Sequence, residues 1–126
     1  MKKIINTQNA PAPIGPYNQA VLSGNTLYTS GQIAINPKNG ELVTNCIEDE
    51  TKQVMKNLKT VLTEAGMTFE HVVKTSIFVK NMNDFTKINT VYGSYFNADT
   101  APARETVEVG NLPKFVNVEI SMIAIK

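Results

Sequence analysis

The chain has 126 residues, of which 42% are hydrophobic and 18% charged, with twelve Lys+Arg against eleven Asp+Glu. This length allows one moderate core, and the composition is that of a globular rather than a disordered protein. A formal charge of +1 leaves no basic surplus to neutralise a run of phosphates, which argues against nucleic acid as a partner. We therefore expect one globular domain over residues 1–126.

The N-terminal residues and the cysteine count bear on where the protein works. The segment 1–6 is basic, but its apolar run is only Ile4-Ile5, far short of the roughly 7–15 residues of a secretory signal. No stretch approaches the ~20 apolar residues of a membrane span, so no membrane partner is expected. Cys46 is the only cysteine and cannot form an intrachain disulfide. These features predict a reducing, cytoplasmic location.

Short strand-like runs occupy the N-terminal third of the chain. Residues 9–17 contain three prolines, which favour extended or turning backbone, and are expected to form an ordered arm that ends at Tyr17. Gly24-Asn25 lies between two strand-like runs and is typical of a hairpin. Three short strands are therefore expected before the first helix, at residues 19–23, 26–29 and 33–35.

The first helix is the clearest element of the pattern. Six apolar side chains recur at helical spacing and form one stripe: Val54, Met55, Leu58, Val61, Leu62 and Ala65. Asn45, with Glu48 three residues later, resembles a capping box at the start. Gly66 suits the position just after the last helical turn. We expect a helix bounded by these residues.

Strand-like and helical periods alternate in the remainder of the chain. Residues 72–80 alternate as a half-buried strand does, with one side made of Val73, Thr75, Ile77 and Val79. A second helix is expected over 84–96, with an inward stripe of Phe85, Ile88, Tyr92, Tyr95 and Phe96. Two more strands follow, at 104–109 and 117–125. The order β-β-β-α-β-α-β-β predicts an α+β fold, a mixed β-sheet with two helices on one face.

The last strand is apolar on both faces. Alternation points Val118, Ile120 and Met122 one way, and Ile123 and Ile125 the other. Two helices can cover only one face of the sheet, so the second face needs another cover from water. A partner subunit is the expected cover, which predicts a homo-oligomer.

Familiar catalytic motifs are absent from the chain. The single histidine and single cysteine, His71 and Cys46, cannot make a zinc site of the usual N/S type, and no metal is expected. There is no dinucleotide-binding Gly-x-Gly-x-x-Gly, no Walker lysine loop and no Gly-x-Ser-x-Gly elbow. His71 precedes a strand and is expected to be solvated or packed. Cys46 has no identifiable His or Asn partner, so a bland thiol is expected rather than a nucleophile.

Two charged residues stand out by their positions. Arg104 opens a strand directly after Ala101-Pro102-Ala103, and Glu119 interrupts the apolar run of the last strand. A carboxylate there is costly unless it is paired, hydrogen-bonded or functional. An arginine is suited to hold a substrate carboxylate through two parallel N–H···O bonds. The two residues are candidates either for a structural ion pair at a subunit seam or for a site.

Longer motifs narrow this choice. The most specific lies near the C-terminus and consists of Ala101–Val109, then Leu112-Pro113-Lys114, then Val118-Glu119-Ile120. Others, in chain order, are Ala12–Tyr17, Tyr28–Ile33, Gln53-Val54, Asn57-Leu58, Ile88-Asn89 and Val91-Tyr92. Taken together and in order, these segments resemble the RidA family, also called the YjgF family of imine deaminases. The resemblance runs from end to end of the chain.

The resemblance implies a chorismate-mutase-like α+β fold assembled as a homotrimer, with sites in clefts between subunits. It implies hydrolytic deamination of reactive 2-imino acids, such as 2-iminopropanoate and 2-iminobutanoate, to 2-keto acids and ammonia. Such imines come from enamines that pyridoxal-phosphate dehydratases release from serine or threonine, and their removal protects other enzymes. No cofactor is implied, because water is the nucleophile and the substrate is already activated.

The resemblance also implies roles for particular residues. Arg104 would clamp the substrate carboxylate beside the backbone N–H of Gly31. Glu119 would hold the attacking water and favour the iminium form, and the backbone carbonyl of Thr106 would help to orient that water. Three further positions match residues that line the family's pocket: Tyr17, Ser30 and Asn89. Each of these three also has a structural interpretation, as an anchor for the arm, part of a plain turn or a solvent-facing helix residue.

The chain departs from the family pattern at several positions. Glu105 follows Arg104 where a small residue is usual, although strand alternation points its side chain to the other face. Three other changes are Thr106 for a frequent Cys, Gly110-Asn111 for Ala-Arg, and Asn18 for Ser. Glu105 keeps open a second hypothesis, a regulatory module of the same fold that binds a small carboxylate without turnover. RNA cleavage is disfavoured by the near-neutral charge and the lack of a histidine pair.

Overall fold

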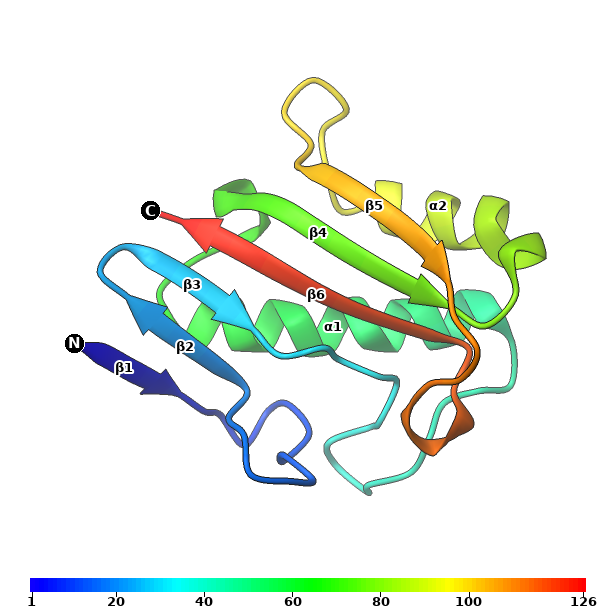
Figure 1. The fold of residues 1–126 in the computed structure, drawn as a ribbon, viewed down its shortest axis with the longest axis horizontal. Coiled ribbons are helices and arrows are strands. Elements are labelled where there is room, and N and C mark those ends of the chain that lie inside the picture. Colours follow the sequence, from blue (N-terminus) through cyan, green and yellow to red (C-terminus); the bar gives the residue numbers. More distant parts are fainter.

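Six strands and two helices make up the fold in a computed structural model that describes all residues, 1–126 (Figure 1). The strands are β1 Lys2–Ile5, β2 Ala20–Ser23, β3 Thr26–Thr29, β4 Val72–Val79, β5 Ala103–Glu108 and β6 Val118–Ile125. They form one sheet in the order β1-β2-β3-β6-β4-β5. The helices, α1 Ile47–Glu64 and α2 Phe85–Gly93, cover one face of it. The predicted α+β class and the placement of both helices are confirmed.

The C-terminal strand, β6, lies inside the sheet. β6 runs antiparallel to β3 on one side and to β4 on the other. β5 lies parallel to β4, because α2 makes the crossover between them. β5 and β1 are therefore the two edge strands. This arrangement leaves Arg104 on an edge and Glu119 near the centre.

The first three strands are not all where the sequence predicted them. Residues 19–23 and 26–29 form β2 and β3 as expected, but residues 33–35 contribute only an isolated bridge, between Ile35 and Leu42. The third early strand is β1, at Lys2–Ile5, which the sequence reading missed. Its first three residues are exposed because it is an edge strand, so only Ile5 carries the burial signal of a strand.

The cap of α1 also differs from the prediction. Cys46, not Asn45, is the N-cap residue, and its sulfur accepts a hydrogen bond from the Asp49 N–H at 3.4 Å. The Asn45 amide instead donates to the Asp49 carboxylate at 2.7 Å, so the predicted capping box with Glu48 is wrong. At the other end Gly66 adopts the expected left-handed conformation, with φ of 72°, that closes the helix. This places Cys46 in a structural role.

Two further elements differ in detail from their patterns. In β4, Thr75, Ile77 and Val79 are buried on one side, as predicted, but Val73 is exposed and Val72 is buried. A bulge between Val72 and Lys74 shifts the register there, so the predicted alternation fails only at this end of the strand. α2 ends at Gly93 rather than at residue 96. The Ser94 hydroxyl donates to the Val91 carbonyl at 2.6 Å, and so competes with continuation of the helix.

The main core lies between the sheet and the helices. The inward stripe of α1 packs against the buried side chains of β6, namely Val118, Ile120, Met122 and Ala124. A smaller cluster of Ile33, Ile35, Leu112 and Val116 lies apart from it, with Phe78 of β4 packed against it. It covers only part of the second sheet face.

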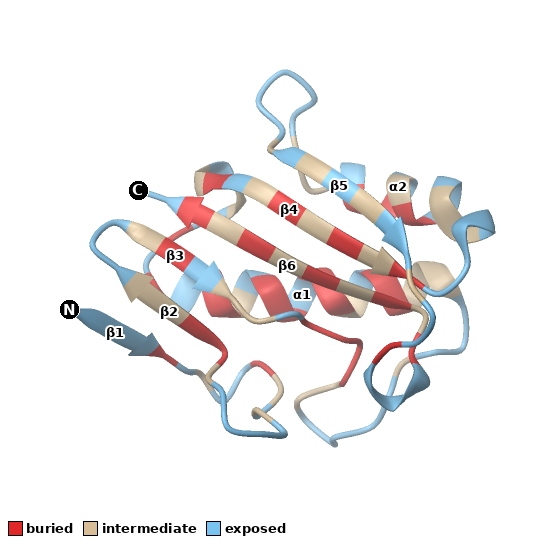
Figure 2. Ribbon diagram, viewed as in Figure 1, coloured by how far each residue is buried: buried red, intermediate tan, exposed pale blue.

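The rest of the second face carries exposed apolar side chains. Ile4, Tyr28, Val107 and Ile125 each remain 41–51% exposed, and their register pairs them with residues that point away from the helices. Figure 2 shows β4 and β6 alternating between buried and less buried residues along their length. The sheet therefore has one face that is buried under the helices and one apolar face that is only partly covered. This agrees with the apolar side chains on both faces of the last strand.

A buried carboxylate joins α1 to the start of β6. Glu50 is fully buried, and its carboxylate accepts hydrogen bonds from the Asn117 N–H at 2.7 Å, the Asn117 side-chain amide at 2.8 Å and the Val118 N–H at 3.2 Å. These bonds satisfy donors that the strand itself leaves free and fix where β6 begins. Glu50 is thus explained by structure rather than by a site.

Glu50→Ala is expected to lower the free energy of unfolding by about 2–4 kcal/mol, because one buried and two part-buried donors lose their acceptor. Chemical denaturation followed by circular dichroism measures this change. Glu64→Ala, at an exposed glutamate of the same helix, is the matched control and should stay within about 0.5 kcal/mol of the parent. Equal effects of the two substitutions would contradict the structural role of Glu50.

No helix in the chain has both the length and the apolar character needed to cross a bilayer.

Candidate active site

Glu119 borders a pocket on the sheet face opposite the helices. Its neighbours Val118 and Ile120 point into the main core, so alternation along β6 turns Glu119 the other way, where it is paired in register with Phe78. The pocket has a volume of about 190 Å³ and is lined by Pro11, Ala12, Pro13, Ile14, Tyr17, Gln19, Gly31, Gln32, Ile33, Ile35, Pro113 and Glu119. At about 30 Å³ per water, this is room for about six water-sized groups. The pocket therefore fits a small organic acid.

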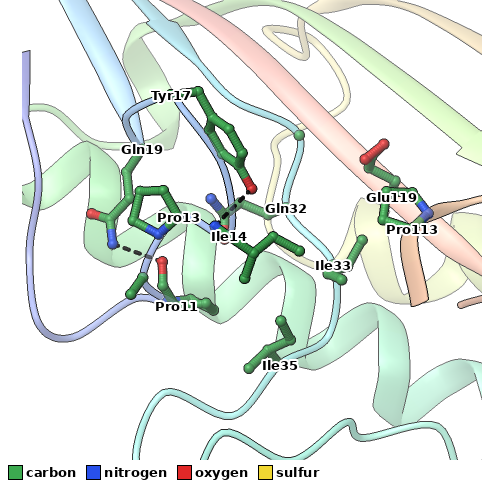
Figure 3. A pocket seen from close by; sticks show the side chains of 12 residues that line it. Pro11, Pro13, Ile14, Tyr17, Gln19, Gln32, Ile33, Ile35, Pro113 and Glu119 are labelled. Atoms are coloured by element: carbon green, nitrogen blue, oxygen red, sulfur yellow. Dashed lines mark hydrogen bonds between the residues drawn. The ribbon is translucent and has the colours of Figure 1, made fainter.

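The proline-rich arm forms one wall of this pocket, as Figure 3 shows. Gln19 is buried, and its amide donates to the backbone carbonyls of Thr7, Ala10 and Pro11 and accepts from the Thr7 N–H. Prolines lack the N–H needed for regular strand pairing, and these four hydrogen bonds take the place of that pairing in the arm. Sequence reasoning missed Gln19, whose only signal was an amide beside an apolar run. The arm is ordered, as predicted, because this one side chain ties it down.

Tyr17 and Ser30 have different surroundings. Tyr17 lines the pocket and is 47% exposed, and its hydroxyl accepts a long hydrogen bond from the Ile14 N–H at 3.4 Å. The Ser30 hydroxyl donates to the Asn18 carbonyl at 2.6 Å and does not line the pocket. Tyr17 thus keeps a free face toward a ligand, whereas Ser30 supports the chain that carries Tyr17.

Gly31 lies directly against Glu119. A methyl group built on Gly31 would come within 2.7 Å of the carboxyl carbon of Glu119, closer than real side chains pack. The glycine therefore lets the backbone and the Glu119 carboxyl lie close together on the pocket wall, and a larger residue would displace that carboxyl. The fold therefore brings Gly31 next to Glu119, whereas the resemblance implied only that Gly31 lies beside Arg104 at the substrate carboxylate.

The Glu119 carboxyl has no hydrogen bond or ion pair within the chain. Burial raises the pKa of Glu119 above its ordinary value, because the charged form loses part of its hydration. A carboxyl with a raised pKa takes up and returns a proton more readily near neutral pH than an exposed one. This is the electrostatic character expected of a proton-transfer group.

Arg104 lies on the opposite face of the sheet from Glu119. It is paired in register with Thr75, a fully buried residue that faces the helices. The guanidinium carbon lies 5.1 Å from the centre of the Tyr92 ring and 5.6 Å from that of the Phe85 ring, both on α2. Within one chain, then, the two charged groups face separate environments. A crevice that contains both must use two chains.

Thr106 and Asn89 belong with Arg104. Thr106 is two residues along β5, on the same side as Arg104, and its hydroxyl oxygen is buried without a hydrogen-bond partner. Asn89 is half-buried on α2, four residues after Phe85 and three before Tyr92, so it shares their helix face. The sequence-predicted site residues therefore fall into two groups on opposite faces of the sheet, with Tyr17, Gly31 and Glu119 in one and Asn89, Arg104 and Thr106 in the other.

Glu105 points away from Arg104, as strand alternation predicted. Its carboxylate forms the one ion pair of the chain, with the Lys74 ammonium at 3.0 Å, and accepts a hydrogen bond from the Ser76 hydroxyl. The hydrogen bond from Ser76, followed by that from Lys74, lowers the pKa of Glu105. The acidic residue that departs from the family pattern is therefore neutralised on its own face. It leaves Arg104 without an anionic partner in the chain.

Metal-ligating side chains do not gather in the fold. No group of three or more His, Cys, Asp or Glu residues lies in an arrangement that could hold a metal ion. His71 accepts a hydrogen bond from the Thr68 N–H at 3.0 Å, in a turn before β4. His71 and Cys46 thus each accept a local backbone hydrogen bond, before β4 and at the start of α1.

Comparisons with known proteins place this architecture in a class. A protein of the Rid family from Yersinia pestis has the same fold, with a TM-score of 0.97 and 50% identity over the whole of both chains. The chain is therefore a Rid-type α+β protein. The family model described as Endoribonuclease L-PSP matches residues 7–126.

Curated relatives agree with this class. A RutC family protein of Pyrococcus horikoshii is 51% identical over 126 residues, covering 100% of this chain and 99% of the relative. A protein of Dermatophagoides farinae named 2-iminobutanoate/2-iminopropanoate deaminase is 48% identical over 124 residues, covering 98% and 96%. The chain belongs to the RidA (YjgF) family.

Proposed function

We propose that this protein hydrolyses reactive 2-imino acids, such as 2-iminopropanoate and 2-iminobutanoate, to 2-keto acids and ammonia in the cytoplasm. The proposal draws on family membership and on the name of the Dermatophagoides farinae relative. The observation that carries it is a pair of groups of opposite charge, neither of which has an ion-pair partner in the chain: the half-buried Arg104 guanidinium on an edge strand, and the Glu119 carboxyl, which lines the pocket. A 2-imino acid has a carboxylate that a guanidinium can bind and a C=N group whose hydrolysis needs proton transfer, so both groups would be used.

Assembly would bring the two groups of site residues together. Arg104 lies on an edge strand and Glu119 on the incompletely covered face, so a neighbouring chain packed on that face can present its Arg104 to this Glu119. The exposed apolar side chains of the same face supply the area to bury. We propose a homotrimer, in which each site takes one half from each of two neighbouring chains.

The proposed chemistry follows from the two groups. Arg104 would bind the substrate carboxylate through two parallel N–H···O bonds, with the Gly31 N–H beside it. The substrate would react as the iminium form, and Glu119 would take a proton from water as the oxygen adds to the C=N carbon, which gives a neutral carbinolamine. The Thr106 carbonyl would orient that water. Glu119 would then return the proton to the amine nitrogen, the C–N bond breaks as the hydroxyl loses its proton, and the products are the keto group and ammonium.

The remaining site residues would shape the pocket. Tyr17 and Asn89 would contact the substrate side chain or hydrogen-bond its polar atoms, and Ser30 would act through the Asn18 carbonyl that positions Tyr17. No cofactor enters the scheme. Holding substrate, water and carboxyl in place would account for most of the rate gain.

A coupled assay tests this function. A pyridoxal-phosphate dehydratase generates 2-iminopropanoate from serine or 2-iminobutanoate from threonine, and ketoacid formation is followed as the purified protein is added. We expect the imine to disappear several-fold or more faster than its spontaneous hydrolysis, with the rate proportional to protein. A rate indistinguishable from that with heat-denatured protein would refute the proposal. Sedimentation of the same sample measures the trimer.

A second candidate is a module that binds a small carboxylate without turnover. Glu105 is the feature that keeps this candidate open, because an acidic residue after Arg104 departs from the family pattern. Saturable binding of 2-oxobutanoate together with a null result in the coupled assay would identify this function. RNA cleavage, suggested by the description of the family model, has no comparable support: the formal charge is +1 and the chain has one histidine.

A further inference from the structure

We propose that Phe85 and Tyr92 are positioning residues that hold the Arg104 guanidinium ready for a carboxylate. The inference rests on the proposed function, in which Arg104 binds the substrate. It adds two residues that the family resemblance and the pocket did not single out as parts of the site. Both lie on α2, seven residues or two helical turns apart, and so present their rings on one side of the helix.

The rings are the contacts that orient this guanidinium. Its carbon is 5.1 Å from the Tyr92 ring centre and 5.6 Å from the Phe85 ring centre, within the range in which a guanidinium is attracted to a ring face. The Arg104 side chain donates no hydrogen bond and forms no ion pair within the chain, whose one ion pair joins Lys74 and Glu105. Because aromatic faces use none of the N–H donors, the planar fork stays free for two parallel bonds to a carboxylate.

Tyr92 is itself fixed to the sheet. It is buried, and its hydroxyl donates a hydrogen bond of 3.0 Å to the hydroxyl oxygen of Thr75, which is fully buried. Thr75 lies on β4 directly opposite Arg104 on β5. Burial raises the pKa of Tyr92, so the phenol stays protonated and keeps donating this bond. The ring is therefore held relative to the strand that carries the arginine.

This arrangement predicts which kinetic constant depends on the rings. A free arginine side chain must give up rotamer freedom when it binds a ligand, whereas one already held between rings has lost part of that freedom before the ligand arrives. The rings touch the guanidinium rather than the reacting C=N carbon. Their loss should therefore raise KM, with little change in kcat.

The kinetic test compares three leucine variants. Phe85→Leu and Tyr92→Leu are each expected to raise KM for 2-iminobutanoate by roughly 3- to 30-fold, while kcat stays within about twofold. Phe69→Leu is the matched control: Phe69 packs edge-on against Tyr95 and Phe96 beyond the end of α2 and is not one of the two rings over which Arg104 lies. It should lower stability without changing KM. Equal changes in all three variants, or a fall in kcat alone, would overturn the positioning role.

A second measurement needs no catalysis. In the parent, the side-chain protons of Arg104 should show upfield NMR shifts from the two rings, and titration with 2-oxobutanoate should move the Nε–H resonance. Phe85→Leu should remove part of the upfield shift and weaken 2-oxobutanoate binding by the same factor as KM. Absence of ring shifts in the parent refutes the positioning role. Ring shifts and 2-oxobutanoate binding without imine hydrolysis would instead refute only the proposed function.

Discussion

Replacing Arg104 with alanine is expected to lower kcat/KM for 2-iminopropanoate by at least about 100-fold. The variant loses two charge-assisted hydrogen bonds to the substrate carboxylate, each worth about 1.5–3 kcal/mol. The loss should appear mainly as weaker binding of substrate and of the ketoacid product. Coupled imine-hydrolysis kinetics and calorimetric titration with 2-oxobutanoate measure the two effects separately.

Two further variants make the result specific to the guanidinium. Arg104→Lys keeps a positive charge but cannot make the forked contact, so it should recover only a minor part of the activity. Lys87→Ala removes an exposed cation from α2 and should leave kinetics unchanged. Arg104→Ala with full activity would contradict the assignment of this residue. If Arg104→Lys kept full activity while Lys87→Ala lost as much as Arg104→Ala, general positive charge rather than a clamp would be responsible.

Glu119→Gln is expected to lower kcat by about 10²–10⁴-fold, because the amide has nearly the same shape but cannot accept the proton from water. Binding of 2-oxobutanoate should persist, since the clamp on its carboxylate is intact. The measurement is again the coupled assay, paired with calorimetric titration of the variant. A fully active variant would remove Glu119 from the mechanism.

The same substitution should make the protein more stable at neutral pH, with Tm higher by about 1–3 °C. Because the pKa of Glu119 is raised by burial, the folded state binds this proton more tightly than the unfolded state. Parent stability therefore falls as pH rises from the ordinary value of 4.5 through the raised folded value. The advantage of the glutamine variant should be full above this window and vanish below it.

The direction of this Tm change also tests the alternative that Arg104 and Glu119 form a structural ion pair across a subunit seam. If the arginine of a neighbouring chain paired permanently with Glu119, removing the carboxylate would leave a cation unpaired and lower Tm instead. A lower Tm for Glu119→Gln at pH 7, restored at pH 4, would therefore favour the structural pair over a site that is free for substrate. Scanning calorimetry at the two pH values makes the comparison.

Local chemistry was sufficient to predict much of the fold. The apolar stripe of α1, its glycine terminator Gly66 and the alternation of β4 and β6 all appear in the structure within a residue or two of their predicted bounds. These elements could be predicted because apolar residues recur along the sequence with the period of a helix or a strand, and so mark the buried face. The prediction failed where a different interaction decided the outcome. Cys46, whose sulfur accepts a hydrogen bond from the helix, is the N-cap residue instead of Asn45. Residues 2–5 have no clear strand pattern of their own and form β1 because they pair with β2.

The residue types of the site could be named from the sequence, but not their grouping. An arginine after Ala-Pro-Ala and a glutamate within an apolar strand were visible as anomalies. Gln19, which ties down the arm, and Phe85 and Tyr92, which face Arg104, were not visible, because amides and aromatic residues are common in ordinary cores and turns.

By itself, then, the sequence determined both helices, five of the six strands, the two-sided apolar character of the last strand and the presence of a cation and an acid suited to a small carboxylate substrate. Only the tertiary structure decided that these two groups point to opposite faces of one sheet. The physical reason is register: whether a side chain on one strand lies above or below the sheet relative to a side chain on another depends on which residues pair between them. That pairing joins segments far apart in the chain, and no local pattern encodes it.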